Sequence, residues 1–534
     1  MTRPTPQRDD AARVAWPRAI AGCHWRLVRQ CDAQAGGMAT LAVAMQTSNP
    51  AHGHPTSGGH ATRRTRRRAA RGTVLIVTLG ILIVLAAMVL VLAHSMRVEG
   101  LCSANRLSAH QAAAVQDGAV QYVLACVDGL DGGVPEQADL LCDGVQVGDG
   151  AFWLLRPDRE DDGQFAFGLA DEGGKVNLNA VPEAMLDKLK DMTVGLPASI
   201  IDWRDEDEEV TAGGAESEYY LMLADPYACK NGPLETVEEL LLVQLADTEL
   251  LFGEDSNRNG VLDENENDAD LSDPPDNRDG HLDRGIYDLV TVYSHPVGGQ
   301  GGGQGEGENE QVNVNQASSQ ELAGALADGV GEDRLPEILT RARRGRPFQN
   351  LFDFYYRTGL TSEEFHAVAG RLTTGGQGGG IGLLNVNTAC QEALLCLPEL
   401  DEADASALVS GRPSSETTEQ DTSSDSDDED DTDADADNLA WIVDVLSQEK
   451  AVAIGSYITT KSYQFSADIV AVSGDGRAFR RCRIIVDAAE SPPRLIYRQD
   501  LTALGWPLSP DILTLLRSGT PMEEVLETTY QEVQ

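Results

Sequence analysis

The sequence is poor in aromatic residues, which make up 5% of its 534 positions, and no two of its cysteines have C-x-x-C spacing. Zinc ribbons need such pairs, so this class of metal site is not expected. Nine cysteines are too few for a disulfide framework in a chain of this length. One or two disulfide bridges are possible, and because the number of cysteines is odd, at least one thiol has no disulfide partner within the chain. Cysteine content therefore does not identify the compartment.

Positive charge is also scarce. Lys plus Arg number 41 against 86 for Asp plus Glu, which gives a formal net charge of -45. A field of this sign repels phosphate backbones, so we expect no nucleic acid to bind the body of the chain. It suits a solvated surface, or a protein that gathers divalent cations. The length allows two or three domains.

Catalytic motifs are missing as well. No G-x-S-x-G, H-E-x-x-H or P-loop pattern occurs, and only nine histidines are present. The acidic run at 202–209 is more typical of a solvated helix end than of paired acid–base catalysts. We therefore predict that the protein is not an enzyme.

One long apolar segment, Thr73–Ala93, contains no charged residue. At about 1.5 Å per residue it spans roughly 32 Å, the thickness of one hydrocarbon core. The alternatives are a buried core helix and a cleaved secretory signal, but the run exceeds a usual signal-peptide core and no clear A-x-A site follows. The positive-inside rule places the N-terminus in the cytoplasm and the body outside. The arginines upstream are Arg63, Arg64, Arg66, Arg67, Arg68 and Arg71.

The basic run ends at Gly72, and the apolar run begins at Thr73. This junction resembles a prepilin-type signal, in which a peptidase cleaves after the glycine and leaves the apolar helix attached. Residues 1–72 would then form a basic leader. Most prepilins carry Glu at the fifth mature position, where this chain has Val77. Lack of that Glu resembles one subclass, the minor pseudopilin K of type II secretion systems.

Helix-forming residues with few breakers continue from Arg97 to Gly129. We predict one long helix, half in the membrane and half packed on a globular head. Its apolar stripe would consist of Leu101, Ala104, Leu107, Ala112, Val115, Ala119, Tyr122 and Val123.

The body is predicted to mix strands with helices. Short apolar runs bounded by Gly and Asp favour hairpin strands at 150–158 and 164–181, and β-branched residues favour a strand at 285–295. Residues 456–487 alternate in strand fashion around the turn Ser473–Gly476, and 494–499 would add an edge strand.

Helices are predicted within 182–252 and 311–412, and Thr236 and Glu239 have the spacing of a capping box. Residues 298–307 read as a Gly-rich linker. The acidic Ser/Thr/Asp run at 416–438 is typical of a disordered surface loop.

An internal repeat supports related helical units: VNLNA at 176–180, VNVNQA at 312–317 and LNVNTA at 384–389. Each copy precedes a helical stretch, where Asn, Ser or Thr would cap exposed N–H groups. The second and third copies resemble helix-hairpin-helix (SAM-like) modules. A DNA-binding role would use the hairpin Gly329–Gly331 and the basic patch Arg341, Arg343, Arg344 and Arg346, but packing or protein contact is the favoured reading.

The segment DSNRNGVLDENE, Asp255–Glu266, fits the EF-hand loop pattern D-x-[DN]-x-[DN]-G-x5-E. Ca²⁺ takes about seven oxygen ligands, and Gly260 allows the sharp turn between them. A merely acidic, solvated loop is the alternative. The predicted calcium ligands are Asp255, Asn257, Asn259, the Val261 carbonyl, Asp263 and Glu266, with Asn277, Asp279 and Asp283 of a weaker copy at 275–283 as further candidates. In that copy, Pro275 and Ile286 replace the first Asp and the final Glu.

An ordered set of motifs now resembles the type II secretion system minor pseudopilin K family over about residues 66–500. It comprises DEGGKVNLNAV, IIDWRDEDEE with the later GGAESEYY, KNGPLETVEELLLV, IYDLVTVYS and the C-terminal strands. The resemblance implies a prepilin-peptidase substrate, a calcium-binding pilin-like head interrupted by a large helical domain, and a place at the pseudopilus tip with minor pseudopilins I and J. The leader is longer than usual for the family, which leaves Met38 and Met45 as alternative starts.

The predicted fold class is α+β: a long N-terminal membrane helix and a pilin-like antiparallel sheet interrupted by helix-hairpin-helix units. We predict a single-pass protein of the inner membrane whose body lies in the periplasm. A membrane-anchored DNA-uptake receptor is the alternative function. The predicted divisions are 1–72, 73–129, 130–181, 182–252, 253–310, 311–375, 376–450, 451–500 and a C-terminal tail at 501–534.

Overall fold

The computed structural model describes residues 71–531, with gaps at 131, 136–139, 158, 160–163, 270, 272–273, 296–310, 328, 376–382 and 414–437. The arginines at 63–68, the Gly-rich linker and the acidic run up to 437 lie outside the described residues. The chain divides into two units, Met1–Ala86 and Ala87–Gln534. In the first, the described residues are helical; the second contains the sheet and the remaining helices.

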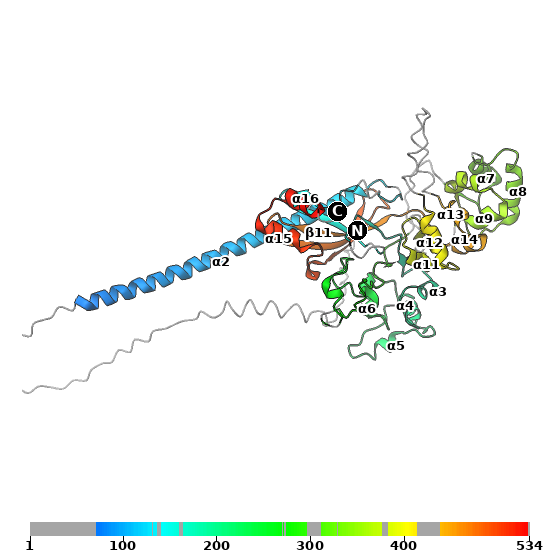
Figure 1. The fold of residues 1–534 in the computed structure, drawn as a ribbon. Coiled ribbons are helices and arrows are strands. Elements are labelled where there is room, and N and C mark those ends of the chain that lie inside the picture. The colour runs from blue at the N-terminus through cyan, green and yellow to red at the C-terminus, as the bar shows by residue number, and fades with distance from the viewer. Residues whose placement is uncertain are drawn as a thin grey trace, which may run out of the picture. The chain divides into compact units, whose positions relative to one another are not determined.

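The first element, α2, is one uninterrupted helix from Arg71 to Cys126 (Figure 1). Its segment Val74–Cys126 is long and apolar enough to cross a membrane, judged by length and composition. The predicted junction at Gly72 and Thr73 lies in its first turn. The predicted apolar stripe packs only from Ala112 onward, because Leu101 and Leu107 are exposed.

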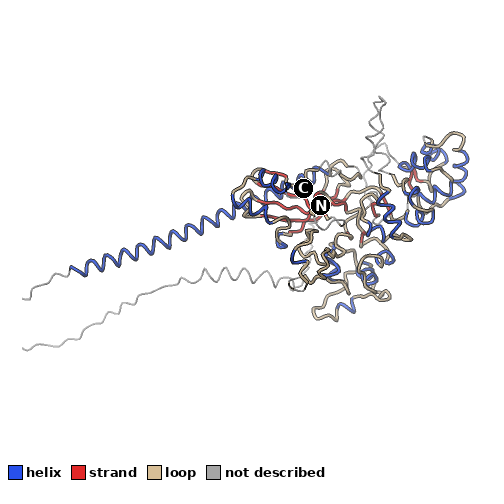
Figure 2. Tube along the Cα trace, viewed as in Figure 1, coloured by secondary structure: helices blue, strands red, loops and turns tan. Residues whose placement is uncertain are grey.

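The head is an antiparallel sheet built from both ends of the chain (Figure 2). Its strand order is β1-β2-β11-β12-β13, with β3 added beside β2 and β4 beside β11. The predicted hairpin around Ser473–Gly476 is confirmed as β11 and β12, and the predicted edge strand is confirmed as β13. The bounds are β1 Val145–Val147, β2 Gly150–Arg156, β3 Ala166–Phe167, β4 Ala170–Asp171, β11 Gln464–Val472, β12 Phe479–Asp487 and β13 Arg494–Asp500.

Both faces of this sheet are covered. Side chains alternate along β2, so Phe152 and Leu154 pack against Val115, Ala119 and Val123 of α2. Gly150 lets α2 come close, since a Cβ there would lie 2.9 Å from a methyl group of Val115.

The opposite face, with Trp153 and Leu155, is covered by α15 (Pro510–Ser518) and α16 (Met522–Gln531). These helices lie beside β11 in Figure 1. The segment predicted as a C-terminal tail is therefore a folded layer of the head, because Ile512, Leu513 and Leu516 complete the core on that face.

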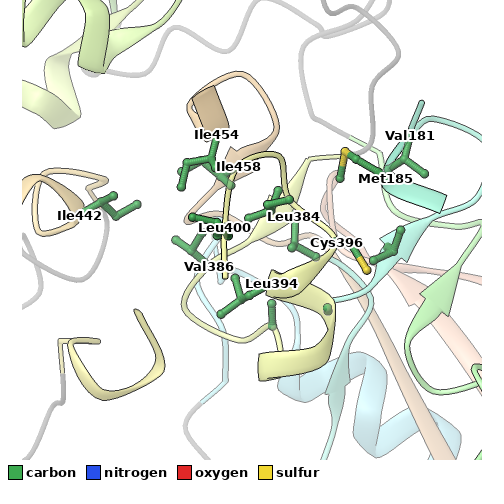
Figure 3. Close-up of a cluster of buried hydrophobic side chains, with 14 of the residues drawn as sticks. Val181, Met185, Leu384, Val386, Leu394, Cys396, Leu400, Ile442, Ile454 and Ile458 are labelled. Atoms are coloured by element: carbon green, nitrogen blue, oxygen red, sulfur yellow. The ribbon is translucent and has the colours of Figure 1, made fainter. Parts of the chain in front are cut away.

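Three pairs of two-residue strands mark out the helical region. Each pair is parallel, and its first strand is one copy of the sequence repeat. The pairs are β5 (Val176–Asn177) with β6 (Val290–Thr291), β7 (Val312–Asn313) with β8 (Leu372–Thr373), and β9 (Leu384–Asn385) with β10 (Ile458–Thr459). In Figure 3, Leu384 and Val386 of the third copy point into a buried apolar cluster with Ile458.

Short helices fill these units. In the first they are α3 (Glu183–Leu186), α4 (Leu196–Arg204), α5 (Ser217–Tyr220), η3 (Val237–Leu242), α6 (Thr248–Phe252) and η4 (Glu264–Glu266). The second contains α7 (Ser319–Leu326), α8 (Leu335–Gly345), α9 (Leu351–Thr358), α10 (Ser362–Val368) and η5 (Ala369–Arg371). In the third lie α11 (Gln391–Leu395), α12 (Glu402–Ser410), α13 (Ile442–Val445) and α14 (Gln448–Ile454), while η7 (Thr502–Leu504) follows β13 in the head.

The repeated asparagines hold loops and do not cap the helices that follow them. Asn315 donates to the Phe348 carbonyl at 3.0 Å and accepts from the Phe348 N–H at 2.8 Å. Asn179 makes the same two-way clamp with Leu234 in the first unit. The expected cap is present on the helix after the second copy, where Ser318 supplies it.

Three local predictions need correction. The strand expected at 285–295 is reduced to β6, because that segment makes only a two-residue ladder with β5. The hairpin expected from 150–158 and 164–181 is confirmed only for β2 and β3, which pair antiparallel, whereas β4 and β5 pair with strands far away in the sequence. Thr236 makes no capping bond, and Glu239 accepts instead from the Trp203 indole. The seven described cysteines are all free thiols.

Candidate metal centre

The predicted calcium loop follows α6, a short helix whose N-cap is Asp247. The helix ends at Gly253, which has a φ of +61°. A Cβ at Gly253 would lie 2.0 Å from the Asp283 carbonyl, so only glycine fits where the chain enters the loop. Asp263 and Glu266 form a capping box that closes the loop with η4.

The first half of the loop turns around Asp255. Its carboxylate accepts the backbone N–H groups of Asn259 at 3.1 Å and Gly260 at 3.0 Å. Gly260 has a φ of +76°, the left-handed turn that the motif requires at this position. The side chains of Asn257 and Asn259 each accept the N–H two residues ahead. These bonds place successive odd-numbered side chains on the inside of the turn.

The second half of the loop forms hydrogen bonds with the first half. Glu266 is 1% exposed and accepts from the N–H groups of Ser256 at 3.0 Å and Asp263 at 3.2 Å. The amides of Asn257 and Asn259 both donate to the Asp263 carboxylate. The structure thus brings together the five predicted side-chain ligands. For Val261 it records only the N–H bond to Asn259, so the role of its carbonyl stays a prediction.

The electrostatics of this loop favour a bound cation. Burial, with Asp288 adding to it, raises the pKa of Asp255 to about 6. Burial and the neighbouring Asp255 raise the pKa of Glu266 to about 7. Two buried carboxylates in one loop repel each other unless a cation or a proton neutralises them. The donor set is entirely oxygen, which suits Ca²⁺.

The weaker copy has the same turn with a different closing residue. Asn277 accepts from the Asp279 N–H, and its amide donates to Asp283 at 2.8 Å, as in the first loop. The final Glu that the sequence lacks is supplied by Glu254, which accepts from the N–H groups of Asn277 and Asp283. Sequence spacing could not find Glu254, because it stands just before the first loop, 21 residues ahead of Pro275.

The first loop is anchored to the sheet by Arg481 of β12. This arginine is 0% exposed, and its Nε lies 3.0 Å from both carboxylate oxygens of Asp468 on β11. Its two terminal nitrogens donate to the carbonyls of Asn257 and Arg258 at 2.6 Å. Arg258 in turn lies 3.9 Å from the ring centroid of Phe252, a cation–π contact. No local pattern in the sequence marks Arg481 for this role.

The acidic run at 202–209 is not uniformly solvated, contrary to our interpretation. Asp202 is fully buried and accepts from the Thr211 N–H, whereas Glu206–Glu209 are exposed.

The basic patch of the second unit is partly used for its own structure. Arg341 pairs with Glu337 and donates to the Thr358 carbonyl, and Arg346 donates to the Ala317 carbonyl. Arg343 and Arg344 are exposed.

Residues 174–251, from just before β5 to α6, match the family model described as type II secretion system (T2SS), protein K. The predicted resemblance to protein K is confirmed. A solved structure titled as the GspK–GspI–GspJ complex of the type 2 secretion system from enterotoxigenic Escherichia coli is also similar. The two chains share 12% identity over 76% of this chain and 98% of that chain, with a TM-score of 0.31. No curated protein matches the sequence.

Proposed function

We propose that the chain is a minor pseudopilin of a type II secretion system. It would occupy the tip of the periplasmic pseudopilus with minor pseudopilins I and J and support the export of folded proteins. The match of residues 174–251 to protein K carries this proposal. The continuous apolar helix α2 supports it, because a pseudopilin needs a segment that can first rest in a membrane and then enter a filament.

In this proposal, α2 holds the protein in the inner membrane, with the arginine-rich leader in the cytoplasm and the head in the periplasm. Prepilin peptidase cleaves after Gly72 and leaves Thr73 as the first residue. N-terminal sequencing of the protein isolated from membranes is expected to begin at Thr73. A start beyond Ala93 would contradict the proposal, because the anchor would have been removed.

A substitution at the junction sharpens this test. Gly72→Ala is expected to leave the leader attached and to abolish co-purification with pseudopilins I and J. Gly80→Ala is the matched control on the same helix, since a Cβ there meets nothing within 4 Å. The control should be processed and assembled normally. Binding of duplex DNA by the purified protein at moderate salt would instead favour an uptake receptor.

Within this role, we assign Ca²⁺ to the loop Asp255–Glu266, with the weaker copy closed by Glu254. The observation that supports the assignment is the burial of Asp255 and Glu266 together in one oxygen-lined turn. The ion would neutralise them and order a loop that is bonded to the sheet through Arg481. Because the unfolded chain lacks this arrangement, calcium binding would add directly to the free energy of folding.

The calcium assignment is tested on the full chain in detergent. Ca²⁺ at about 100 times its dissociation constant should raise the free energy of unfolding by about 2.7 kcal/mol per site. Glu266→Gln should remove the contribution of the first loop, whereas Glu264→Gln, an exposed neighbour, should retain it. Calorimetry that detects no Ca²⁺ binding, or equal binding by the two variants, would refute the assignment.

A further inference from the structure

An exposed apolar surface lies on the first helical unit, at the ends of α5 and η3. Leu221 and Met222 follow α5 and are 58% and 74% exposed, and Leu242 at the end of η3 is 40% exposed. Monomeric proteins rarely leave several large apolar side chains exposed together, and such a surface marks a contact with another molecule. We call this surface the α5–η3 patch; it consists of Val194, Leu221, Met222, Leu241, Leu242 and Leu245.

Two tyrosines hold the segments that follow α5 and η3 side by side. The Tyr227 hydroxyl donates to the Leu242 carbonyl at 2.8 Å, and the Tyr220 hydroxyl accepts from the Gln244 N–H at 3.1 Å. The rings of the two tyrosines stack, with their centroids 5.3 Å apart. The loop 221–226 between the tyrosines is therefore fixed next to the end of η3.

The core of the unit is complete without the patch. Leu240 of η3 is 1% exposed, whereas Leu241 and Leu242, which follow it, face outward. Leu245 extends the patch to the turn before α4, since a Cβ at Gly195 would lie 3.5 Å from the leucine side chain. Because the patch residues do not fill the core, they can be changed without opening a cavity there.

Negative charge surrounds the patch. Residues 174–251 contain seventeen acidic side chains against five basic ones. Leu245 also lines a groove of about 1110 Å³, together with Asp191, Asp247 and Glu249. An apolar patch beside an acidic groove is complementary to an apolar surface that is ringed by lysine and arginine.

The internal segments outside the described residues offer little to cover the patch. The gaps at 296–310, 376–382 and 414–437 contain only two large apolar residues, Val297 and Ile381. In the proposed function, the leader stays on the cytoplasmic side. A second copy of the chain would bring the same negative charge to the contact, and an anionic lipid surface would be repelled in the same way. These considerations favour a different protein, one with positive charge around its contact surface.

Neighbouring subunits of a filament would use another surface. Met96, Leu101 and Leu107 of α2 are exposed, so subunits that assemble around α2 would cover them. The buried part of α2 belongs to the core between the helix and the sheet, whereas the patch lies over the core of the helical units, which includes Tyr220 and Leu240. A protein on the patch could therefore be bound while the contacts along α2 are occupied.

We propose that the α5–η3 patch docks the folded proteins that the secretion system exports, through an apolar surface ringed by lysine and arginine on the exported protein. This proposal deepens the proposed function and rests on it. The flexible, unbranched side chain of Met222 can adapt to surfaces of different shape, which a docking site for more than one exported protein needs. The acidic groove would hold the basic residues at the edge of the contact.

The proposal is tested with the full chain, in cells that carry the whole secretion system. The photoreactive amino acid p-benzoylphenylalanine replaces Leu245, and the crosslinked products are identified by mass spectrometry. An exported protein is defined as one that reaches the culture medium of parent cells but not that of cells lacking the chain. The expected result is a crosslink between position 245 and such a protein.

A double variant tests whether the patch carries this contact. Met222→Glu combined with Leu242→Glu should reduce both the crosslink and the export of the same protein by about ten-fold or more, because a few apolar anchors supply most of the affinity of an interface. Ile496→Glu is the matched control, because Ile496 is 43% exposed, close to the value for Leu242, and lies on β13 of the head. The control should give the crosslink and the export of the parent.

The proposed function is checked in the same cells. The parent and both variants should begin at Thr73 and co-purify with pseudopilins I and J; a parent chain that does neither contradicts the proposed function itself. With processing and co-purification intact, the docking proposal is overturned if the probe crosslinks only to I, to J, to a second copy or to lipid, or to nothing. Export and crosslinking of the double variant at the parent level would also overturn it.

A single variant replaces the double variant if urea unfolding shows that the latter does not fold. Val194→Glu serves this purpose, because Val194 is 100% exposed and has no packing to lose. It should weaken the crosslink by about three-fold or more. A crosslink of unchanged yield in this variant would overturn the proposal.

Discussion

Replacing Arg481 by methionine should uncouple the loop Asp255–Glu266 from the sheet. Arg481 is buried, pairs with Asp468 and donates to two carbonyls of the loop. The substitution leaves Asp468, which is 15% exposed, without its partner and leaves the carbonyls of Asn257 and Arg258 without these donors. Removing one member of a buried ion pair typically costs about 3–5 kcal/mol, so we expect a loss in this range.

The assay is urea unfolding of the full chain in detergent, with and without Ca²⁺, followed by tryptophan fluorescence. Trp153 and Trp506 make an edge-to-face contact at the sheet, with ring centroids 5.9 Å apart, so they report on the head. Arg494→Met is the control, because Arg494 is 71% exposed and pairs with an exposed Glu490. Such a surface pair contributes about 0–1 kcal/mol.

The coupling itself is measured by a double-mutant cycle between Arg481→Met and Glu266→Gln. If the loop acts on the sheet through Arg481, the two losses should be non-additive by about 0.5–3 kcal/mol. The reasoning is refuted if Arg481→Met costs no more than Arg494→Met. If the losses of the two variants are strictly additive, the coupling is refuted, but the stabilising role of the Arg481–Asp468 ion pair is not.

Two further predictions concern the buried network and the repeats. Burial alone would raise the pKa of Glu172, but Lys175 and Arg483 lower it from 4.5 to about 2. The stability that ionised Glu172 contributes should therefore be complete above pH 4.5 and be lost as the pH falls from 4.5 through 2. Glu172→Gln should flatten the pH dependence of stability in that window and should cost about 3–5 kcal/mol at pH 7, measured by urea unfolding. Asn315→Ala and Asn179→Ala should each cost about 1–3 kcal/mol in the same assay, because each leaves one backbone N–H and one carbonyl unpaired. If the two costs differ and one lies far outside this range, the two clamps are not equivalent.

Features set by local sequence could be predicted. The long helix α2 follows from an apolar run and a breaker-free continuation, and β11 and β12 follow from alternation on either side of an SGDG turn. The turn of the loop at 255–266 is also local, because the spacing of Asp255 and Glu266 fixes which side chains face inward. In each case, the residues that determine the structure lie within a few turns or one hairpin of one another.

Features that depend on distant partners could not be predicted. The segment at 285–295 is rich in β-branched residues, but its ladder with β5 is only two residues long. Thr236 and Glu239 have capping-box spacing, yet the Glu239 carboxylate accepts a hydrogen bond from the Trp203 indole instead. Glu254 and Arg481 acquire their roles from chain segments that only the fold brings near them.

The sheet of the head has a consequence for the order in which the chain folds. Strand β2 pairs with β11, so the sheet joins the first strands after α2 to strands made near the end of synthesis. Until Gln464–Asp487 arrives, the core between β2 and the stripe on α2 lacks Phe465, Ile469 and Ile484. The helical units lie between these strands in the sequence and can complete their shorter loops first. Closure of the head is therefore a late event, and a chain truncated before β11 would leave this apolar surface exposed.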